Sequence, residues 1–130
     1  MADVERGNRP LSPHLQVYRL PLNATVSILH RATGVAVGLV LMILALWFLG
    51  AAWSEPVFNA IDWLVTSWLG WLVLLAGAAS LWLHFFNGLR HLIWDTGAWF
   101  GQKRVRKSAV VTIALAAAMT LVTLIVAIVW

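Results

Sequence analysis

Three long stretches without a charged side chain constrain the fold of this chain more than any other feature. Residues 32–53, 63–89 and 108–130 contain no Asp, Glu, Lys or Arg. Each is long enough to cross the ~30 Å hydrocarbon core of a bilayer as a helix. With 62% hydrophobic and 11% charged residues, the chain has too little polar surface for a soluble domain. We therefore predict an all-α integral membrane protein with three transmembrane helices, spanning about 22–51, 63–92 and 108–130.

The first 21 residues differ in character from the remainder, so we divide the chain into an arm, 1–21, and a three-helix membrane domain, 22–130. The arm is polar, and its prolines disfavour a helix within it. The last of these, Pro21, suits the start of a helix. It lacks the apolar core of a signal peptide, and its two acidic residues argue against a mitochondrial presequence. We expect a retained arm in a bacterial inner-membrane protein, with a mature organellar chain as the alternative.

The charges between the apolar stretches predict the orientation of the helices. The connection at 54–62 carries two acidic residues and no basic one, whereas the segment 90–107 carries five basic residues. The positive-inside rule then places the N-terminus and the basic segment in the cytoplasm and the C-terminus on the far side. The net charge of +4 is therefore interpreted as a signal of topology and not of nucleic-acid binding. Since the chain has no cysteine, any metal chemistry must rest on histidine.

One histidine lies inside the second uncharged stretch. On a helix it belongs to a stripe of small and polar residues, namely Gly70, Gly77, Ser80, His84, Gly88 and His91. In lipid such a stripe turns inward, toward other helices or a cofactor. His84 could therefore make an interhelical hydrogen bond, or it could be an axial ligand of a haem whose edge fits beside Ser80 and Gly88. His91 lies about 10 Å further along the axis, which suits a haem propionate better than the same iron.

The start of the first predicted helix holds a second polar group. Ser27 and Arg31 are one turn apart, and His30 lies beside them, so a hydroxyl, a cation and an imidazole share one depth. A ligand with carbonyl or carboxylate groups at the membrane edge would need such donors, and haem propionates would lie near His30 and Arg31. The alternative is that Arg31 extends to the lipid headgroups. Gly34 and Gly38 would admit another helix or a flat ligand close to the backbone.

A haem with two histidine ligands would need a second ligand at comparable depth. The third uncharged stretch contains no histidine, and His30 lies close to the first turns of its helix. We therefore expect the second ligand to come from another subunit. This chain is then one part of an assembly.

Three motifs carry a resemblance to a known family. They are RPLSPHLQVY at 9–18, SILHRATG at 27–34 and HFFNGLRHLIWD at 84–95. In this order they resemble the cytochrome b subunit of succinate dehydrogenase, the larger membrane anchor of complex II. The third helix contributes only its hydropathy to the resemblance.

The resemblance implies partners, cofactors and residue roles. The partners would be a flavoprotein carrying FAD, an iron-sulfur protein with its clusters, and a second three-helix anchor that completes the bundle. Electrons would pass from succinate through these groups to ubiquinone, with no catalysis by this chain alone. His84 would be one axial ligand of haem b, shared with the second anchor, and His30 and His91 would lie near its propionates. Ser27 and Arg31 would line the quinone site.

Two questions stay open at this level. The family includes quinol:fumarate enzymes with differing haem content, so the resemblance does not fix the direction of turnover. A different class of protein, a non-redox membrane scaffold or small transporter, would use the glycine faces for packing and the histidines for hydrogen bonds. A haem b spectrum of the purified complex would distinguish the two classes.

Overall fold

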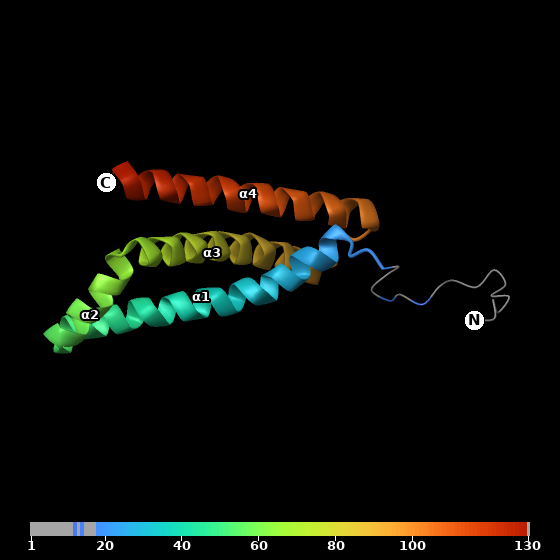
Figure 1. The fold of residues 1–130 in the computed structure, drawn as a ribbon. Helices are drawn as coiled ribbons and strands as arrows, with labels where there is room; N and C mark the ends of the chain where they lie inside the picture. Colours follow the sequence, from blue (N-terminus) through green and yellow to red (C-terminus); the bar gives the residue numbers. More distant parts are fainter. Residues whose placement is uncertain (1–11, 13, 15–17, 130) are drawn as a thin grey trace, which may run out of the picture.

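The structure is a computed structural model that describes residues 12, 14 and 18–129, so most of the arm lies outside the described residues. The described part contains four α-helices, which are α1 (Leu22–Trp53), α2 (Glu55–Thr66), α3 (Trp68–Asp95) and α4 (Gln102–Val129). Figure 1 shows α3 between α1 and α4, with the short α2 returning the chain from α1 to α3. The expectation of an all-α fold is confirmed.

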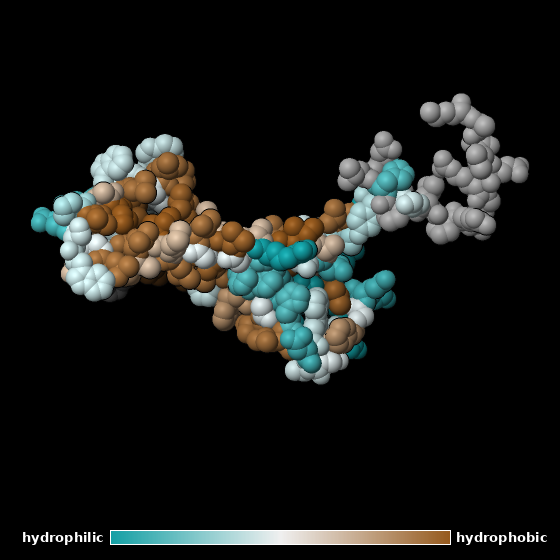
Figure 2. Space-filling model, turned by 90° about the horizontal axis from the view of Figure 1, so that it is seen from below, coloured by the Kyte–Doolittle hydropathy of each residue, from teal (hydrophilic) through white to brown (hydrophobic). Residues whose placement is uncertain are grey.

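The surface of the helices is apolar along most of their length. The three long helices α1, α3 and α4 are each long and apolar enough to cross a membrane. Many large hydrophobic side chains on them are exposed, such as Leu41, Phe48 and Ile125. On the face in Figure 2, brown apolar residues cover much of the helices, and teal residues gather near the arm. Exposure of this much apolar surface to water would cost ~25 cal/mol per Å², so lipid is the solvent that fits. The prediction of three transmembrane helices is confirmed.

The helix bounds differ in two places from those expected. The helix α1 begins at Leu22, directly after Pro21, as expected. Residues 55–62 of the expected connection and residues 63–66 of the expected span 63–92 instead form α2, so α3 begins only at Trp68. The helix α2 starts with an acidic residue and a proline, both favourable in a first turn. The backbone breaks at Ser67, whose hydroxyl oxygen accepts a hydrogen bond from the Gly70 amide and caps α3.

The fourth helix begins at Gln102, six residues before the stretch 108–130 that hydropathy marked. Hydropathy detects the part of a helix that suits hydrocarbon, and the hydrogen-bonded helix continues beyond it. The basic residues expected in a loop, from Lys103 to Lys107, therefore lie on the first turns of α4.

Two different faces of α3 make the helix contacts. On one face, the Gly77 backbone approaches Val40 of α1 so closely that a Cβ on the glycine would lie 2.9 Å from the valine Cγ2. On another face, the Trp82 indole N–H donates to the Thr123 hydroxyl of α4 at 2.9 Å. The small and polar stripe therefore packs on α1, and the inward orientation expected for His84 is correct.

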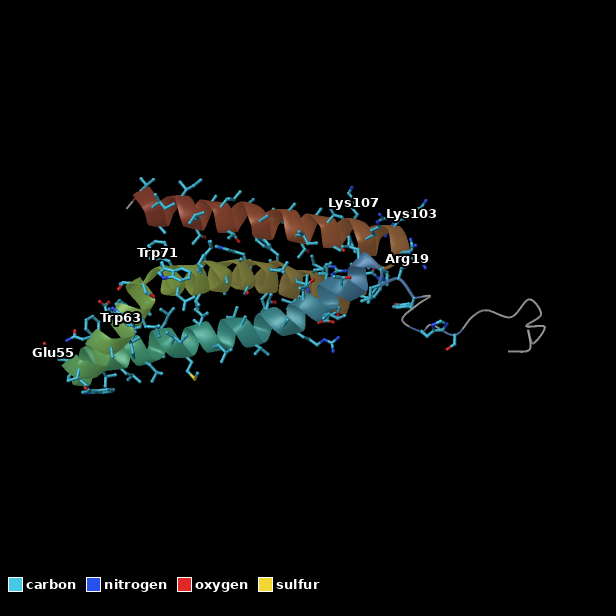
Figure 3. The ribbon with its side chains drawn as sticks, viewed as in Figure 1. Arg19, Glu55, Trp63, Trp71, Lys103 and Lys107 are labelled. Carbon is cyan, nitrogen blue, oxygen red and sulfur yellow. The ribbon has the colours of Figure 1, made fainter. Side chains whose placement is uncertain are left out.

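Basic residues gather at one end of the molecule, and the acidic residue Glu55 lies at the other end. Figure 3 shows Arg19, Lys103 and Lys107 at the end where the arm joins α1, and Glu55 at the other end. This separation is typical of a membrane protein that obeys the positive-inside rule. The orientation of the helices in the membrane stays a prediction.

Candidate functional site

The imidazole of His84 points at the backbone of α1. Its Nδ1 lies 3.0 Å from the carbonyl oxygen of His30. A carbonyl oxygen can only accept a hydrogen bond, so Nδ1 carries the hydrogen and Nε2 keeps its lone pair. Within residues 18–129, no hydrogen bond reaches that Nε2. His84 therefore offers one ring nitrogen in a fixed tautomer.

Three histidines gather around this point. The rings of His30 and His84 are stacked, with centroids 4.0 Å apart and planes 13° apart. The ring of His91 lies 5.2 Å from that of His30 and packs edge-on against Trp94. The Nδ1 atom of His30 is buried and has no hydrogen-bond partner in the part of the chain described. The structure thus brings together the three histidines that the sequence placed on two helices, and it leaves a buried polar atom among them.

Gly34 and Gly38, two of the three glycines of α1, differ in what surrounds them. A Cβ on Gly34 would lie 2.9 Å from Cε1 of His84, so only a glycine leaves room for the ring. A Cβ on Gly38 would meet no described atom within 4 Å. The expected close approach is confirmed at Gly34, and Gly38 makes no such contact within this chain.

Ser27 and Arg31 lie on the same turn of α1 as His30. The side chain of Ser27 is partly exposed and that of Arg31 is exposed. Neither makes a side-chain hydrogen bond or an ion pair with the described residues. Both groups are free to bind a ligand or partner from outside the chain, and their assignment to a quinone site stays a prediction.

Arg90 corrects the sequence analysis, which counted it among the charges of a loop. It lies in α3, and only 4% of its surface is exposed. Its guanidinium donates to the Asn87 side-chain oxygen at 2.9 Å and to the Ser108 hydroxyl at 3.0 Å, and it lies 4.1 Å from the ring centre of Trp94. Asn87 is also fully buried and was missed. Their spacing of three residues, which places them on one face of a helix, was the available signal.

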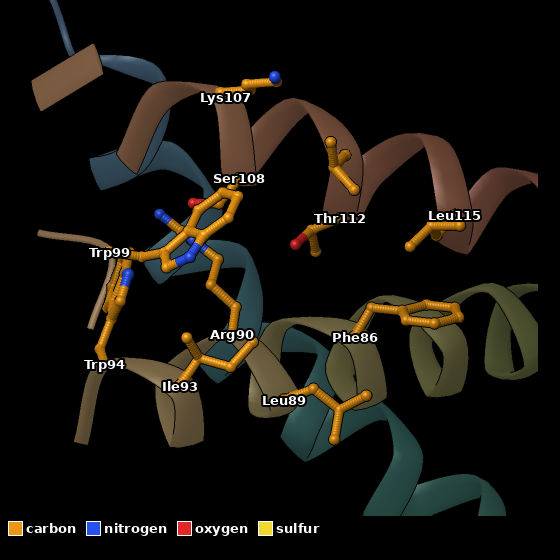
Figure 4. Close-up of a pocket in the computed structure, with 11 residues that line it drawn as sticks. Phe86, Leu89, Arg90, Ile93, Trp94, Trp99, Lys107, Ser108, Thr112 and Leu115 are labelled. Atoms are coloured by element: carbon orange, nitrogen blue, oxygen red, sulfur yellow. The ribbon is translucent and has the colours of Figure 1, made fainter. Parts of the chain in front are cut away.

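A cavity of about 350 Å³ lies between α3 and α4, on the side of α3 away from the histidines. Figure 4 shows Arg90 extending past Trp94 toward Ser108 at one end of this cavity, and Phe86 and Leu115 at the other. Its walls are mostly apolar. None of the predicted site residues lines it, since Ser27, His30, Arg31, His84 and His91 all lie elsewhere.

The histidine cluster offers one ring nitrogen, the Nε2 of His84, as a candidate metal ligand. In the described residues there is no group of three or more His, Cys, Asp or Glu side chains that could hold a bare metal ion. A metal ion bound at His84 would therefore need further ligands from outside the described residues. The free Nε2 of His84 supplies the required lone pair, and the unpartnered Nδ1 of His30 supplies a nearby polar group.

Three apolar helices, with histidines clustered between two of them, define the chain as an all-α membrane protein with a polar group inside its bundle. A sequence model of the succinate dehydrogenase/fumarate reductase transmembrane subunit family matches residues 5–123. The chain belongs to this family. The resemblance noted in the three motifs is thereby confirmed.

Individual relatives agree with this assignment. The chain is 46% identical over 126 residues to the succinate dehydrogenase cytochrome b556 subunit of Paracoccus denitrificans, covering 97% of each chain. It is 37% identical over 97 residues to the cytochrome b556 subunit of Rickettsia felis, covering 75% of each. It is also 36% identical over 120 residues to the cytochrome b560 subunit of Reclinomonas americana, covering 88% of this chain and 83% of that one.

Proposed function

We propose that this chain is the haem b-binding membrane anchor of a succinate dehydrogenase and that it forms part of the ubiquinone-reduction site. The relatives are named as cytochrome b subunits of that enzyme, which supports the general assignment. The observation that carries the haem proposal is the bond from His84 Nδ1 to the His30 carbonyl, because it leaves Nε2 as a ligand of fixed orientation.

His84 would be the axial ligand from this chain, and the second anchor subunit would provide the other. When bound, the haem would supply one-electron redox chemistry between the iron-sulfur clusters and the quinone. The His30 carbonyl orients the His84 ring, as backbone acceptors do for metal-bound histidines. His30, Arg31 and His91 are the groups that face the propionates, and the buried Nδ1 of His30 gains a partner there.

The turn of α1 that carries Ser27 and Arg31 binds the quinone. The Ser27 hydroxyl donates to a quinone carbonyl, and the Arg31 guanidinium stabilises negative charge on the quinone once it has gained an electron. Arg31 is exposed from this chain, so it can reach a ligand at the boundary with the partner subunits.

Succinate oxidation belongs to the partners. FAD and the iron-sulfur clusters reside in the flavoprotein and iron-sulfur subunits, a division that the names of the relatives, as cytochrome b subunits of succinate dehydrogenase, support. The complex is placed in the bacterial inner membrane, with the basic end of the anchor and its histidine cluster toward the cytoplasm.

The test is the His84→Ala variant in the purified complex. We expect the reduced-minus-oxidised haem b spectrum to be lost or converted, while membrane insertion persists because a span this apolar does not need one imidazole. His14→Ala, which changes an exposed histidine of the arm, is the matched control and should keep the spectrum. An unchanged spectrum of a haem with two histidine ligands in the assembled His84 variant would refute the assignment. A complex without haem b and with an unaltered quinone reductase rate would favour the scaffold alternative.

A further inference from the structure

We infer that Asn87 and Arg90 are positioning residues for quinone reduction, because they hold the turn of α1 that carries Ser27 and Arg31. This inference rests on the proposed function, which gives that turn its role. Neither side chain needs to touch the quinone. Both act through the backbone of α1.

The link between α3 and α1 is a buried amide. The Asn87 Nδ2 donates to the carbonyl oxygen of Val26 at 3.4 Å, and both residues have 0% of their surface exposed. That carbonyl belongs to the peptide bond that joins Val26 to Ser27. In the α-helix it also accepts the N–H of His30, four residues later. The Asn87 amide therefore holds the α1 backbone directly before Ser27, the first of the two predicted quinone-site residues.

Arg90 fixes which way the Asn87 amide faces. Its Nη1 donates to the Asn87 Oδ1 at 2.9 Å. A guanidinium has donors only, so it selects the amide oxygen and leaves the amide N–H groups directed at Val26. Without Arg90, the amide could turn over and present its oxygen to the carbonyl of Val26, which would be repulsive.

The far end of the network is anchored on α4. The Arg90 Nε donates to the Ser108 hydroxyl oxygen at 3.0 Å, and its Nη2 donates to the Val105 carbonyl at 3.5 Å. The Ser108 hydroxyl in turn donates to the Val105 carbonyl at 2.9 Å, so its lone pairs are available to Arg90. Figure 4 shows the Arg90 side chain reaching from α3 toward Ser108. The network thus runs from α4 through α3 to the Ser27 turn.

A cation held inside an apolar bundle is costly unless it has a function or a full set of partners. Each of the three Arg90 nitrogens already has an acceptor within the chain, and the Trp94 ring lies 4.1 Å from the guanidinium carbon. Arg90 therefore supports a neighbouring site and does not bind the quinone itself. Within the described residues, the hydrogen bonds that link Arg90 to the Ser27 turn pass through Asn87.

Two substitutions separate the links of the network. Asn87→Asp keeps an acceptor for Arg90 and removes the N–H donor to Val26. Ser108→Ala removes an acceptor of Arg90 at the far end of the network. Thr112→Val is the matched control, because Thr112 lines the same cavity one turn along α4 and shows no side-chain hydrogen bond to the described residues.

The measurements use the purified four-subunit complex. In Asn87→Asp and Ser108→Ala we expect the KM for ubiquinone to rise about two- to tenfold, the change that the loss of one hydrogen bond produces. Amide hydrogen exchange in residues 26–34 should become faster, because the turn is held less firmly. Haem content and succinate oxidation with an acceptor upstream of the membrane should be unchanged. Thr112→Val should alter neither the KM nor the exchange.

Ser27→Ala in the same assay separates this inference from the proposed function. If Ser27→Ala raises the KM while Asn87→Asp and Ser108→Ala change neither the KM nor the exchange, the inference is overturned and the quinone site stands. If exchange becomes faster but no variant, including Ser27→Ala, changes the KM, the turn is held by the network and the quinone assignment is overturned. Should Asn87→Asp fail to assemble, Ser108→Ala decides alone, since it removes a single hydroxyl from α4.

Discussion

The ring of His84 occupies the space where a side chain on Gly34 would begin. A Cβ built on Gly34 lies 2.9 Å from the His84 Cε1 and 3.4 Å from its Nδ1. Because Gly34 has no side chain, the His84 ring comes within hydrogen-bond distance of the His30 carbonyl, which lies on the same helix as Gly34. The fixed tautomer of His84 therefore depends on the absence of a side chain one turn further along α1.

Gly34→Ala should disturb the haem site, whereas Gly38→Ala should not. The added methyl group at Gly34 must displace the His84 ring and weaken its bond to the His30 carbonyl, which is worth about 0.5–1.5 kcal/mol. The methyl group at Gly38 meets no described atom within 4 Å, and alanine favours helix over glycine by ~1 kcal/mol. The haem-to-flavin ratio and the haem absorption spectrum of the purified complexes measure the difference. Equal haem content and identical spectra in the two variants would contradict the contact.

Ser27→Ala and Arg31→Leu should slow quinone reduction to different extents. The first removes a hydrogen bond to a neutral carbonyl, worth roughly 0.5–1.5 kcal/mol, and the second removes a charged donor, worth about 1.5–3 kcal/mol. Arg31→Leu should therefore lower ubiquinone reductase activity more than Ser27→Ala. Steady-state rates over a range of ubiquinone concentrations, with inhibitor titrations, measure the order.

Succinate oxidation provides the control measurement for the same two variants. Succinate oxidation by an artificial acceptor upstream of the membrane should survive both, because the flavin and clusters lie in other subunits. Haem should persist in Ser27→Ala, and Arg31→Leu should weaken it if the guanidinium pairs with a propionate. A variant with full ubiquinone reductase activity and normal inhibitor sensitivity would remove its residue from the pocket. For Arg31 this result would restore the interpretation of a side chain that extends to the lipid headgroups.

Reporter fusions should establish the orientation of the helices. A reporter after Trp130 is expected on the periplasmic side and one inserted near Gly101 on the cytoplasmic side, because four basic residues lie close after Gly101, between Lys103 and Lys107. Alkaline phosphatase and green fluorescent protein fusions read the two sides in opposite ways. The reverse pattern would place the histidine cluster and the predicted quinone site at the wrong face of the membrane.

Thr123→Val should weaken the packing of α3 on α4 more than Thr120→Val. The Thr123 hydroxyl accepts the bond from the Trp82 indole, whereas the Thr120 hydroxyl, within the described part of the chain, bonds only to the Ala116 carbonyl of its own helix. We expect a loss of about 1 kcal/mol for Thr123→Val, since an indole N–H is left without its partner in an apolar setting. Thermal unfolding of the purified complex measures this difference. Equal midpoints for the two variants would show that the interhelical bond contributes nothing.

The sequence predicted some elements better than others for a physical reason. A long uncharged run is a local property, so α1, the apolar part of α3 and the apolar part of α4 could be located from composition alone. The helix α2 was missed because it is short and carries Glu55 and Asp62, and hydropathy treats such a segment as a connection. The acidic residue and the proline at its start were the sequence signals that could have predicted α2.

For this protein, the sequence alone determined that lipid is the solvent, that three helices cross it, and that His84 lies on the small and polar side of its helix. It also carried the motifs of the family. The tertiary structure decided which helix that side meets, that His84 donates to the His30 carbonyl, and that Arg90 is buried against α4 instead of facing water. The helical repeat states which residues share a face, but the neighbour of that face depends on contacts between segments far apart in the chain.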